Sequence, residues 1–515
     1  MTQEREPSQS PARATKRKEV VRSDGATAGV LRYRSPAGRW VIVATVLGSG
    51  IAALDATVVG IALPSIGREF HADVAGLQWV LTGYLLSLAS LLLLGGALGD
   101  RYGRRRIFVI GVVWFASASL LCGLAPNTPV LVVARALQGV GGALLVPGSL
   151  AILQATFVPG DRGLAIGAWS GLGGVATAIG PFLGGYLIGA VSWRLVFFIN
   201  LPLSLAVVAI AVRHVPESRD PAASGPLDLA GAALGAAGLV GLCYGLIEGP
   251  ALGWGAIPVV LMMGAGAVSL VAFLLVEARN QHPMLPLSLF KARQFSVANA
   301  VTFVVYGGLG GALFLLPIEL QQVARYSPLE SGVALLPLTA MMLALSSRSG
   351  ALASRIGPKL QMGTGPLIVA VGLWMFVRVD GSGGYLGEVL PAVIVLGLGL
   401  AVMVAPLTVT VLAAAPTEKA GVASAVNNDV ARSAGLMAVV ALPAIAGISG
   451  TSYLHPLMFS RGFHMAMVVA ALLCAFGGLL AMLAIRNPAR WPSVAPRPSS
   501  RQAHCALEAP PLQGT

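Results

Sequence analysis

Charged residues are scarce in this chain. Only 11% of its 515 residues are Asp, Glu, Lys or Arg, whereas 56% are hydrophobic and the mean hydropathy is +0.80. An ordinary soluble domain carries about 25% charged residues. So little charge cannot cover the surface of a soluble protein of this size, and the composition therefore predicts a membrane protein.

Cysteine is also rare, and its spacing is irregular. The four cysteines are Cys122, Cys243, Cys474 and Cys505, and none of their separations matches a set of metal ligands. The first three lie in apolar runs, where a cysteine behaves as a small hydrophobic residue. We expect neither a disulfide nor a metal site.

Motifs for nucleotide chemistry and hydrolysis are missing. No Lys follows a Gly, which removes the core of a phosphate-binding loop, and there is no His-Glu-x-x-His. We therefore expect no enzyme, no cofactor and no ATP-driven pump. The net charge of +13 could suggest nucleic acid. The basic residues, however, concentrate beside hydrophobic ends and in the tails, so topology explains them better and no nucleic-acid partner is expected.

Long apolar runs dominate the rest of the sequence. A lipid bilayer needs about 20 apolar residues for each spanning helix. Fourteen such runs are found, at residues 40–63, 79–98, 107–124, 130–153, 164–189, 195–212, 227–248, 256–277, 296–318, 333–353, 362–379, 388–412, 420–447 and 462–485. An all-helical polytopic protein with fourteen transmembrane helices is therefore predicted.

The distribution of Lys and Arg predicts the orientation of these helices. With the N-terminus inside the cell, the inner loops hold fourteen basic residues, and the outer loops hold only five, namely Arg68, Arg194, Arg325, Arg378 and Arg461. Cytoplasmic loops are enriched in Lys and Arg, so both termini are predicted to be cytoplasmic in the cell membrane. The predicted parts are an N-terminal tail (1–39), a six-helix bundle (40–212), a two-helix insert with flanking loops (213–295), a second six-helix bundle (296–485) and a C-terminal tail (486–515).

The inner loop after segment 79–98 combines glycines with one carboxylate and four arginines. It reads Gly96-Ala-Leu-Gly-Asp100-Arg101-Tyr-Gly103-Arg104-Arg105-Arg106. A topological anchor would explain the arginines but not the spacing of the acid and the glycines. The loop resembles the signature loop of the Major Facilitator Superfamily. This resemblance implies a conformational gate made of Gly96, Asp100, Arg101, Gly103, Arg104 and Arg105.

A weaker copy of this loop occurs in the second half of the chain. It reads Gly350-Ala-Leu-Ala-Ser354-Arg355-Ile-Gly357-Pro-Lys359, with Ser354 where the acid would stand. The repeat favours duplicated halves, from which many transporters build a site at the membrane midplane. We predict a Major Facilitator fold with helices arranged as six, two and six, in two pseudo-symmetric six-helix halves. The insert is interpreted as lipid-facing packing.

Segment 164–189 carries a second pattern of small residues. Its Gly180-Pro181-Phe-Leu-Gly184-Gly185 stretch follows glycines at four-residue spacing. Such spacing lets helices approach closely, and a proline permits a bend. The stretch is similar to the motif that marks antiporters in the superfamily, made here of Gly180, Pro181, Gly184 and Gly185.

Further stretches narrow the resemblance to the fourteen-helix drug:proton antiporter family. They are Leu54-Asp55-Ala-Thr57-Val-Val-Gly60-Ile-Ala-Leu63-Pro64, Gln78-Trp79-Val-Leu-Thr-Gly-Tyr84, Trp193-Arg194-Leu-Val-Phe197-Phe198-Ile-Asn200-Leu-Pro202 and Leu320-Gln321-Gln322-Val. Similarity covers roughly residues 40 to 485. One departure is Gly60, where the family usually has Asn.

Asp55 and Arg135 are the clearest charges inside predicted helices. Such a charge at a helix centre costs about 2.5 to 3.5 kcal/mol on insertion scales. With a rise of about 1.5 Å per residue, the two lie at a similar depth in the outer half of the membrane. They form either a structural salt bridge or a proton-coupling site. Arg135-Ala-Leu-Gln138-Gly139 resembles the family's proton-transfer motif.

Segment 420–447 holds a second charged pair, Asp429 and Arg432. These residues are three apart and share one helix face, so they can neutralise each other. Alternatively, Asp429 faces the transport path as a cation contact or a second proton site. The substrate cavity is predicted to involve Trp79, Tyr84, Gln138, Gln321, Asn427 and Asp429.

The predicted function is proton-coupled export of hydrophobic or amphipathic small molecules, such as drugs, antibiotics or dyes, by alternating access. Its energy source is the proton gradient, its partners are the substrate, protons and lipid, and no oligomer is required. The alternative is an exporter of one endogenous metabolite, such as a self-made antibiotic or a siderophore. A membrane sensor or scaffold is a further, non-transport interpretation.

Overall fold

The computed structural model describes residues 31–220, 227–280, 283–379, 383–416 and 420–487. Most of the predicted tails, at 1–39 and 486–515, therefore lie outside the described residues. Within the described ranges the regular elements are helices. The predicted fold class, an all-helical membrane protein, is confirmed.

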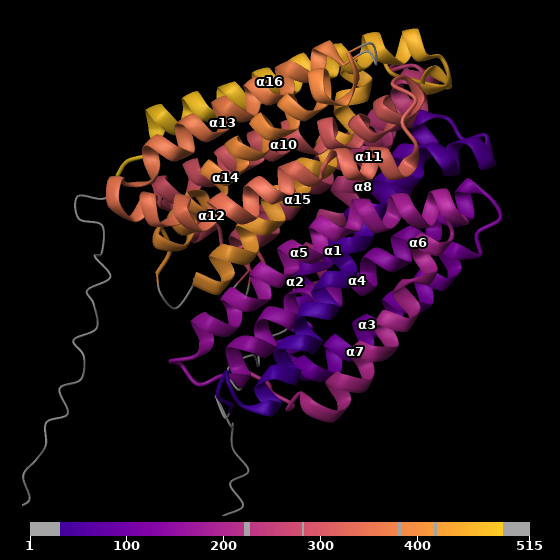
Figure 1. Cartoon of the computed structure of the whole chain (residues 1–515). Helices are drawn as coiled ribbons and strands as arrows, with labels where there is room; N and C mark the ends of the chain where they lie inside the picture. Colours follow the sequence, from indigo (N-terminus) through magenta and orange to yellow (C-terminus); the bar gives the residue numbers. More distant parts are fainter. Residues whose placement is uncertain (1–30, 221–226, 281–282, 380–382, 417–419, 488–515) are drawn as a thin grey trace, which may run out of the picture.

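The helices form two halves joined by an insert (Figure 1). The N-terminal half comprises α1 (Pro36–Phe70), α2 (Val74–Tyr102), α3 (Arg104–Gly123), α4 (Thr128–Thr156), α5 (Arg162–Ala190), α6 (Leu195–Phe198) and α7 (Asn200–His214). The insert comprises α8 (Leu229–Leu252) and α9 (Ile257–Arg279). The C-terminal half comprises α10 (Arg293–Gln322), α11 (Pro328–Ala334), α12 (Leu336–Ile356), α13 (Pro358–Met375), α14 (Leu390–Ala413), α15 (Ala420–Ile445) and α16 (Pro456–Ala484), together with the short turns η1 (Leu287–Lys291), η2 (Phe376–Arg378), η3 (Tyr385–Val389) and η5 (Ser452–Leu454).

Thirteen helical segments in the described ranges are long and apolar enough to cross a membrane. Helix α15 is not among them, and it carries the polar residues Asn427, Asn428, Asp429 and Arg432. It nevertheless packs against α10 and α2 within the bundle. With α15 the segments account for the fourteen predicted helices.

The helices are longer than the apolar runs that predicted them. Helix α1 extends over Pro36–Phe70 rather than 40–63, with Ser35 capping its first turn and His71 ending it in a left-handed conformation. Apolar runs measure the thickness of the hydrocarbon, whereas a helix continues until its backbone groups are capped. Two predicted helices are interrupted: 195–212 divides at Ile199, and the helix predicted at 333–353 begins earlier and divides at Leu335.

A single glycine joins two helices at the corresponding place in each half. Gly103 lies between α2 and α3 with a φ of 115°, and Gly357 lies between α12 and α13 with a φ of 83°. Side chains rarely adopt such angles, so glycine is required for these one-residue turns. We call this end of the bundle the joint end. The opposite end, where α1 turns into α2 at His71, is the far end.

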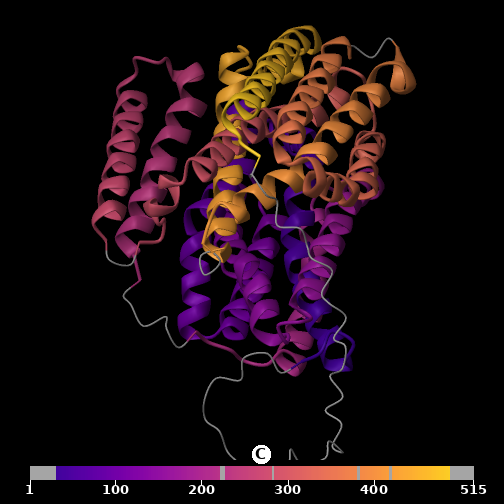
Figure 2. The ribbon, with the colours of Figure 1, turned by 90° about the vertical axis from the view of Figure 1, so that its left-hand side faces the viewer.

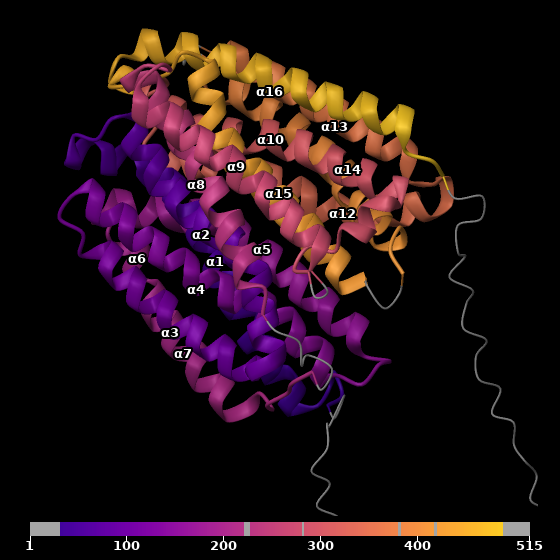
Figure 3. The same cartoon turned by 180° about the vertical axis from the view of Figure 1, so that it is seen from behind.

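The insert lies to one side of the two halves (Figures 2 and 3). Its helices pack mainly against each other, and α8 also contacts α2 of the N-terminal half and α15 of the C-terminal half. One side-chain contact fixes this position: Trp79 Nε1 donates to Glu248 Oε1 at 2.8 Å. The insert therefore has a protein-facing side as well as the lipid-facing side that the sequence suggested.

Candidate functional site: a joint-end cavity and a buried polar network

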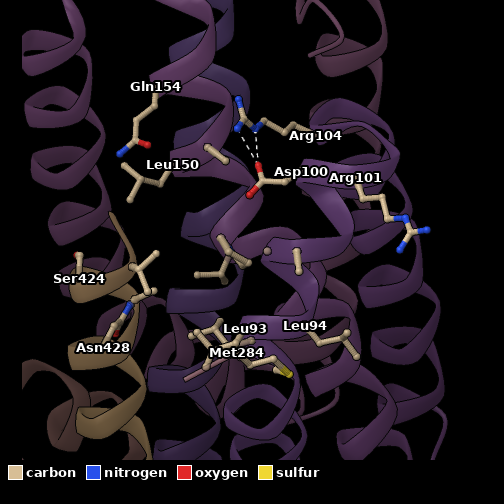
Figure 4. Close-up of a pocket in the computed structure, with 18 of the residues that line it drawn as sticks. Leu93, Leu94, Asp100, Arg101, Arg104, Leu150, Gln154, Met284, Ser424 and Asn428 are labelled. Carbon is tan, nitrogen blue, oxygen red and sulfur yellow. Dashed lines mark hydrogen bonds and ion pairs between the residues drawn. The ribbon is translucent and has the colours of Figure 1, made fainter. Parts of the chain in front are cut away.

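A cavity of about 670 Å³ opens at the joint end between the two halves. Leucines of α2 and α4 form an apolar wall, with Leu93, Leu94 and Leu150 among them (Figure 4). Ser424 and Asn428 of α15 face them across the cavity. A mainly apolar space with a few polar groups suits an amphipathic small molecule.

The predicted gate residues lie at the rim of this cavity. Gly96, Asp100, Arg101 and Arg104 line it, whereas Gly103 forms the turn. Arg104 binds Asp100 through two nitrogens, at 2.8 and 2.7 Å, as the dashed lines in Figure 4 show. The carboxylate of the signature loop is thus paired inside its own half in this conformation.

The rest of the signature loop is tied to the segment that follows α7. Glu217 accepts hydrogen bonds from the backbone nitrogens of Arg105 and Arg106, each at 3.1 Å, and the Arg105 side chain donates to Val215 O. Arg104 N donates to Ser218 O at 2.9 Å. Sequence reasoning missed Glu217, although an acid in the predicted inner loop after segment 195–212, on the same side of the membrane as the signature loop, was a usable signal.

Asp55 and Arg135 meet in the interior of the N-terminal half. The Arg135 guanidinium lies 2.5 Å from Asp55 Oδ2, and both side chains are 0% exposed. Arg135 also donates to Gln138 Oε1 at 2.6 Å and lies over the Tyr84 ring, with its carbon 4.4 Å from the ring centre. Helix geometry predicted that Asp55 and Arg135 lie at a similar depth, and in the structure they are in direct contact.

Three neutral side chains complete this buried polar network. Gln138 Nε2 donates to Asp55 Oδ1 at 2.8 Å, and Asn200 Nδ2 donates to the same oxygen at 3.1 Å. Ser119 accepts from both amides, at 3.0 and 2.8 Å. Helices α1, α3, α4 and α7 therefore converge on one buried polar network.

Two atoms of the network have no hydrogen-bond partner: Arg135 Nη2 and Asn200 Oδ1. None of the five members of the network lines the joint-end cavity. The sequence did not reveal Ser119, and Asn200 entered only as part of a family-like stretch. In the sequence, Ser119 and Asn200 are each a polar residue in an apolar run. Such residues are too common in helices for this pattern to indicate a functional site.

The predicted cavity residues do not line the joint-end cavity in this conformation. Gln138 belongs to the buried network, the Tyr84 ring packs against Arg135, and Trp79 faces the insert at Glu248. Their helices turn these side chains toward neighbouring helices rather than toward the space between the halves. The observed lining comes from residues one or more turns nearer the joint end.

The remaining cavity candidates belong to the C-terminal half. Asn427 Nδ2 donates to Asn299 Oδ1 at 3.0 Å and to Thr302 Oγ1 at 2.9 Å, both on α10. Asp429 and Arg432 are not among the ion pairs recorded within the described residues. Asp429 Oδ1 and Arg432 Nε are buried atoms without a hydrogen-bond partner. One atom of each side chain is therefore left available to other groups.

The halves are joined across the far end. Gln321 Nε2 of α10 donates to Ile61 O of α1 at 3.0 Å, and Gln78 Nε2 of α2 donates to Val439 O of α15 at 2.9 Å. Val74 N also donates to Gly450 O at 2.8 Å. The far end is held closed by these contacts while the joint end holds the cavity.

The Gly-Pro stretch of α5 packs against both halves. A β-carbon at Gly180 or Gly184 would collide with Thr57 or Val58 of α1, and one at Gly185 would collide with the backbone of α11. Pro181 O in turn lies against Gly332 of α11. The stretch is therefore a close-contact surface between α5, α1 and α11. The earlier glycines of α5, Gly163, Gly167 and Gly171, have no such neighbour within 4 Å.

Metal binding receives no support from the described part of the chain. Within it, no group of three or more His, Cys, Asp or Glu side chains could hold a metal ion.

Two helical halves around a cavity that opens at one end are the architecture of a membrane transporter. The chain belongs to the Major Facilitator Superfamily, whose sequence profile matches residues 45–440. It is a multi-pass membrane protein of that transporter superfamily.

Relatives of this chain are resistance and export proteins. It is 37% identical to the tetracenomycin C resistance and export protein of Streptomyces glaucescens over 82% of this chain and 76% of that protein. It is 36% identical to the multidrug resistance protein Stp of Mycobacterium tuberculosis, over 75% and 72%. It is 33% identical to the methylenomycin A resistance protein of Bacillus subtilis, over 85% and 92%.

Solved transporter structures share the fold at low identity. A D-xylose–proton symporter has a TM-score of 0.62 with 15% identity, over 87% of this chain and 98% of that chain. A bacterial homologue of the human lysosomal transporter Spinster, in an inward-facing and unoccupied conformation, has a TM-score of 0.61 with 16% identity, over 87% and 97%. These likenesses support the Major Facilitator fold.

Proposed function

We propose that this protein exports hydrophobic or amphipathic small molecules across the cytoplasmic membrane in exchange for protons, as a fourteen-helix drug:proton antiporter. Support for export comes from the relatives, whose names describe resistance and export. The apolar lining of the joint-end cavity supports the kind of substrate. The proton gradient is the proposed energy source.

We place the joint end and both termini in the cytoplasm. The arginines of the signature loop lie at this end, and cytoplasmic loops are enriched in Lys and Arg. On this assignment the structure is inward-facing, with its cavity open to the cytoplasm and its far end closed. In this conformation Asp100 pairs with Arg104, so the signature loop would engage the C-terminal half only in the outward-facing state.

The observation that carries proton coupling is the fully buried Asp55–Arg135 pair. A carboxylate removed from water favours its neutral form, whereas a nearby arginine favours its ionised form. A small change in the distance or hydration of Arg135 would therefore change proton binding at Asp55. The amides of Gln138 and Asn200 both donate to Asp55 Oδ1, and they can keep these hydrogen bonds to either form of the carboxyl group.

A set of charge-neutralising variants tests this proposal. The purified protein is placed in proteoliposomes, and ethidium transport and proton movement are followed together. Asp55→Asn should lose ethidium-driven proton movement. The double variant D55N/R135Q removes both buried charges, so a purely structural pair predicts that it regains coupled transport. Loss of coupling in a folded double variant supports a proton site at Asp55.

The matched control for these variants is Glu330→Gln. Glu330 is exposed and lies at the start of α11. This variant should keep wild-type ethidium and proton movement. Wild-type proton movement in folded Asp55→Asn would overturn the assignment of Asp55.

A dedicated exporter of one antibiotic is the second candidate. Relatives named for single compounds include those for tetracenomycin C, puromycin, actinorhodin and methylenomycin A. Growth inhibition of an overexpressing strain by a panel of unrelated antibiotics and dyes separates the two candidates. Resistance to one compound class favours the dedicated exporter, and resistance across classes favours the multidrug exporter.

Asp429 is proposed to contact the transported molecule or a proton. Its unpartnered Oδ1 and the unpartnered Nε of Arg432 are available for such a contact. Asp429→Ala should then lose export of cationic dyes but keep export of neutral compounds. Equal export of both kinds of compound by wild type and variant would exclude a role in cation contact.

A further inference from the structure

The base of the insert forms part of the wall of the joint-end cavity. Leu227 and Asp228 precede α8, and Pro283, Met284 and Pro286 follow α9, and all five line the cavity. Figure 4 draws Met284 among the residues that line the cavity. The insert therefore reaches the transport path with its two ends, although most of its length lies to the side of the bundle.

Two carboxylates hold these ends of the insert together. Asp228 accepts hydrogen bonds from Gly231 N at 2.8 Å and from Asn280 Nδ2 at 2.7 Å. Glu277 Oε2 accepts from Leu285 N at 3.1 Å. Asp228 thus joins the start of α8 to the end of α9, and Glu277 fixes the segment that lines the cavity.

The two carboxylates lie close together and are buried. A β-carbon built on Gly231 would lie 2.8 Å from Asp228 Oδ2 and 2.9 Å from Glu277 Oε1. Both oxygens therefore lie against the same glycine and are near neighbours. Asp228 is 8% exposed and Glu277 is 2% exposed. Glu277 Oε1 has no hydrogen-bond partner.

No cation compensates this pair within the described residues. The recorded ion pairs there include neither Asp228 nor Glu277. Of the charged groups on the surrounding elements, Asp100, Arg101 and Arg104 line the same cavity and Arg279, which ends α9, is exposed. The others are Asp73 at the start of α2, Glu248 of α8, Lys291 of η1, and Asp429 and Arg432 of α15. Ser424 and Asn428, the polar residues of α15 in the cavity wall, are neutral.

The helix termini distinguish the two carboxylates. Asp228 is the N-cap of α8, where the helix dipole stabilises negative charge. Glu277 lies in the last turn of α9, where the dipole disfavours negative charge. Two negative charges on buried carboxyl groups this close are costly, and Glu277 is the one at the less favourable helix end.

We propose that Glu277 holds a proton beside Asp228, and that this proton exchanges with the solution in the joint-end cavity. The insert then provides a further proton-binding site, separate from the Asp55–Arg135 pair and from Asp429. Its link to export depends on the proposed function. The presence of a proton on Glu277 does not depend on that function.

Infrared spectroscopy of the purified full-length protein in lipid tests this proposal without any transport measurement. A protonated carboxyl group and an ionised one absorb at different frequencies. At neutral pH the wild-type minus Glu277→Gln difference spectrum should show the band of a protonated carboxyl group. In D2O this band should move to lower frequency, because the proton exchanges. The same difference for Glu330→Gln, at an exposed carboxylate, should lack the band.

Absence of the band from the Glu277→Gln difference spectrum would overturn the proposal, as would a band that does not move in D2O. Asp228→Asn gives an independent test, since the Asn side-chain oxygen retains the cap for Gly231 N. Removal of the neighbouring negative charge should let Glu277 lose its proton at a lower pH than in wild type. An unchanged titration midpoint would contradict the pairing. Failure of ethidium transport in wild type would count against the proposed function alone.

Discussion

Arg135 balances the charge of Asp55 at a site that water does not reach. Both side chains are 0% exposed, and the guanidinium also donates through Nε to Val80 O at 3.2 Å. Removal of one member of a buried pair leaves an uncompensated charge, which costs about 3–5 kcal/mol. Removal of both members avoids that cost.

Arg135→Gln is therefore expected to lower the free energy of unfolding by about 3–5 kcal/mol. The double variant D55N/R135Q should recover most of this loss. Denaturant unfolding of the detergent-solubilised protein measures both values. Equal stability of the single and double variants would show that the two charges do not depend on each other.

Asn200 connects α7 to the same carboxylate. Asn200→Ala removes the hydrogen bonds to Asp55 and Ser119 and is expected to lower the free energy of unfolding by about 1–3 kcal/mol. Thermal unfolding provides the measurement. Ser117→Ala is the control, because the exposed Ser117 hydroxyl bonds only to Val113 O of its own helix. If the two variants were equally stable, Asn200 would not support the network.

At the scale of single residues, the sequence predicted how deep a side chain lies in the membrane better than which side chains it contacts. The positions of Asp55 and Arg135 along their helices implied a shared level in the membrane. The neighbours Ser119 and Asn200 come from helices whose rotation about their axes no local pattern defined. Trp79 and Tyr84 illustrate the same limit, since they face the insert and Arg135 rather than the joint-end cavity.

At the scale of elements, the close packing of α5 against α1 depends on glycines. Gly184 lies against Val58 of α1, so a methyl group there must push the helices apart. Overpacking of this kind typically costs about 1–3 kcal/mol. Gly171 on the same helix has no atom within 4 Å of a built β-carbon.

Gly184→Ala is accordingly expected to lower both ethidium export and thermal stability. Gly171→Ala should leave both unchanged, or raise stability slightly because alanine favours helix over glycine. Export in vesicles and thermal unfolding of the purified variants supply the two readouts. Similar behaviour of the two variants would refute the close-contact role of the Gly-Pro stretch.

Helix existence was predictable from apolar runs, but helix continuity was not. The breaks at Ile199 and Leu335 leave apolar sequence on both sides, so hydropathy does not register them. The longer ends of α1 follow from capping and contacts beyond the hydrocarbon. The glycine joints at Gly103 and Gly357 were visible in the sequence, because few other residues adopt their backbone angles.

At the scale of the whole molecule, hydrogen bonds between the halves hold the far end closed. Gln321 contributes one of them by donating to Ile61 O. The net worth of such a bond is about 0.5–1.5 kcal/mol. Its loss should shift the equilibrium between conformations about twofold to tenfold toward an open far end.

Gln321→Ala is the variant that tests this shift. Spin labels at Arg68 of α1 and Leu457 of α16, both exposed, report the separation of the halves at the far end. Their distance distribution should gain a longer component in the variant. Gln361→Ala is the control, since Gln361 donates to Ser349 within the C-terminal half. The same distribution in both variants would mean that Gln321 does not hold the far end.

The sequence by itself determined the membrane class, the number of helices, the duplicated loops and the buried charges. These properties follow from local requirements: hydrocarbon thickness, the cost of burying charge, and backbone angles open only to glycine. Tertiary structure alone decided which residues surround Asp55, which line the joint-end cavity and which end of the bundle is closed. The reason is that each of these depends on the rotation and separation of helices distant in sequence, and similar apolar faces permit many arrangements until packing selects one.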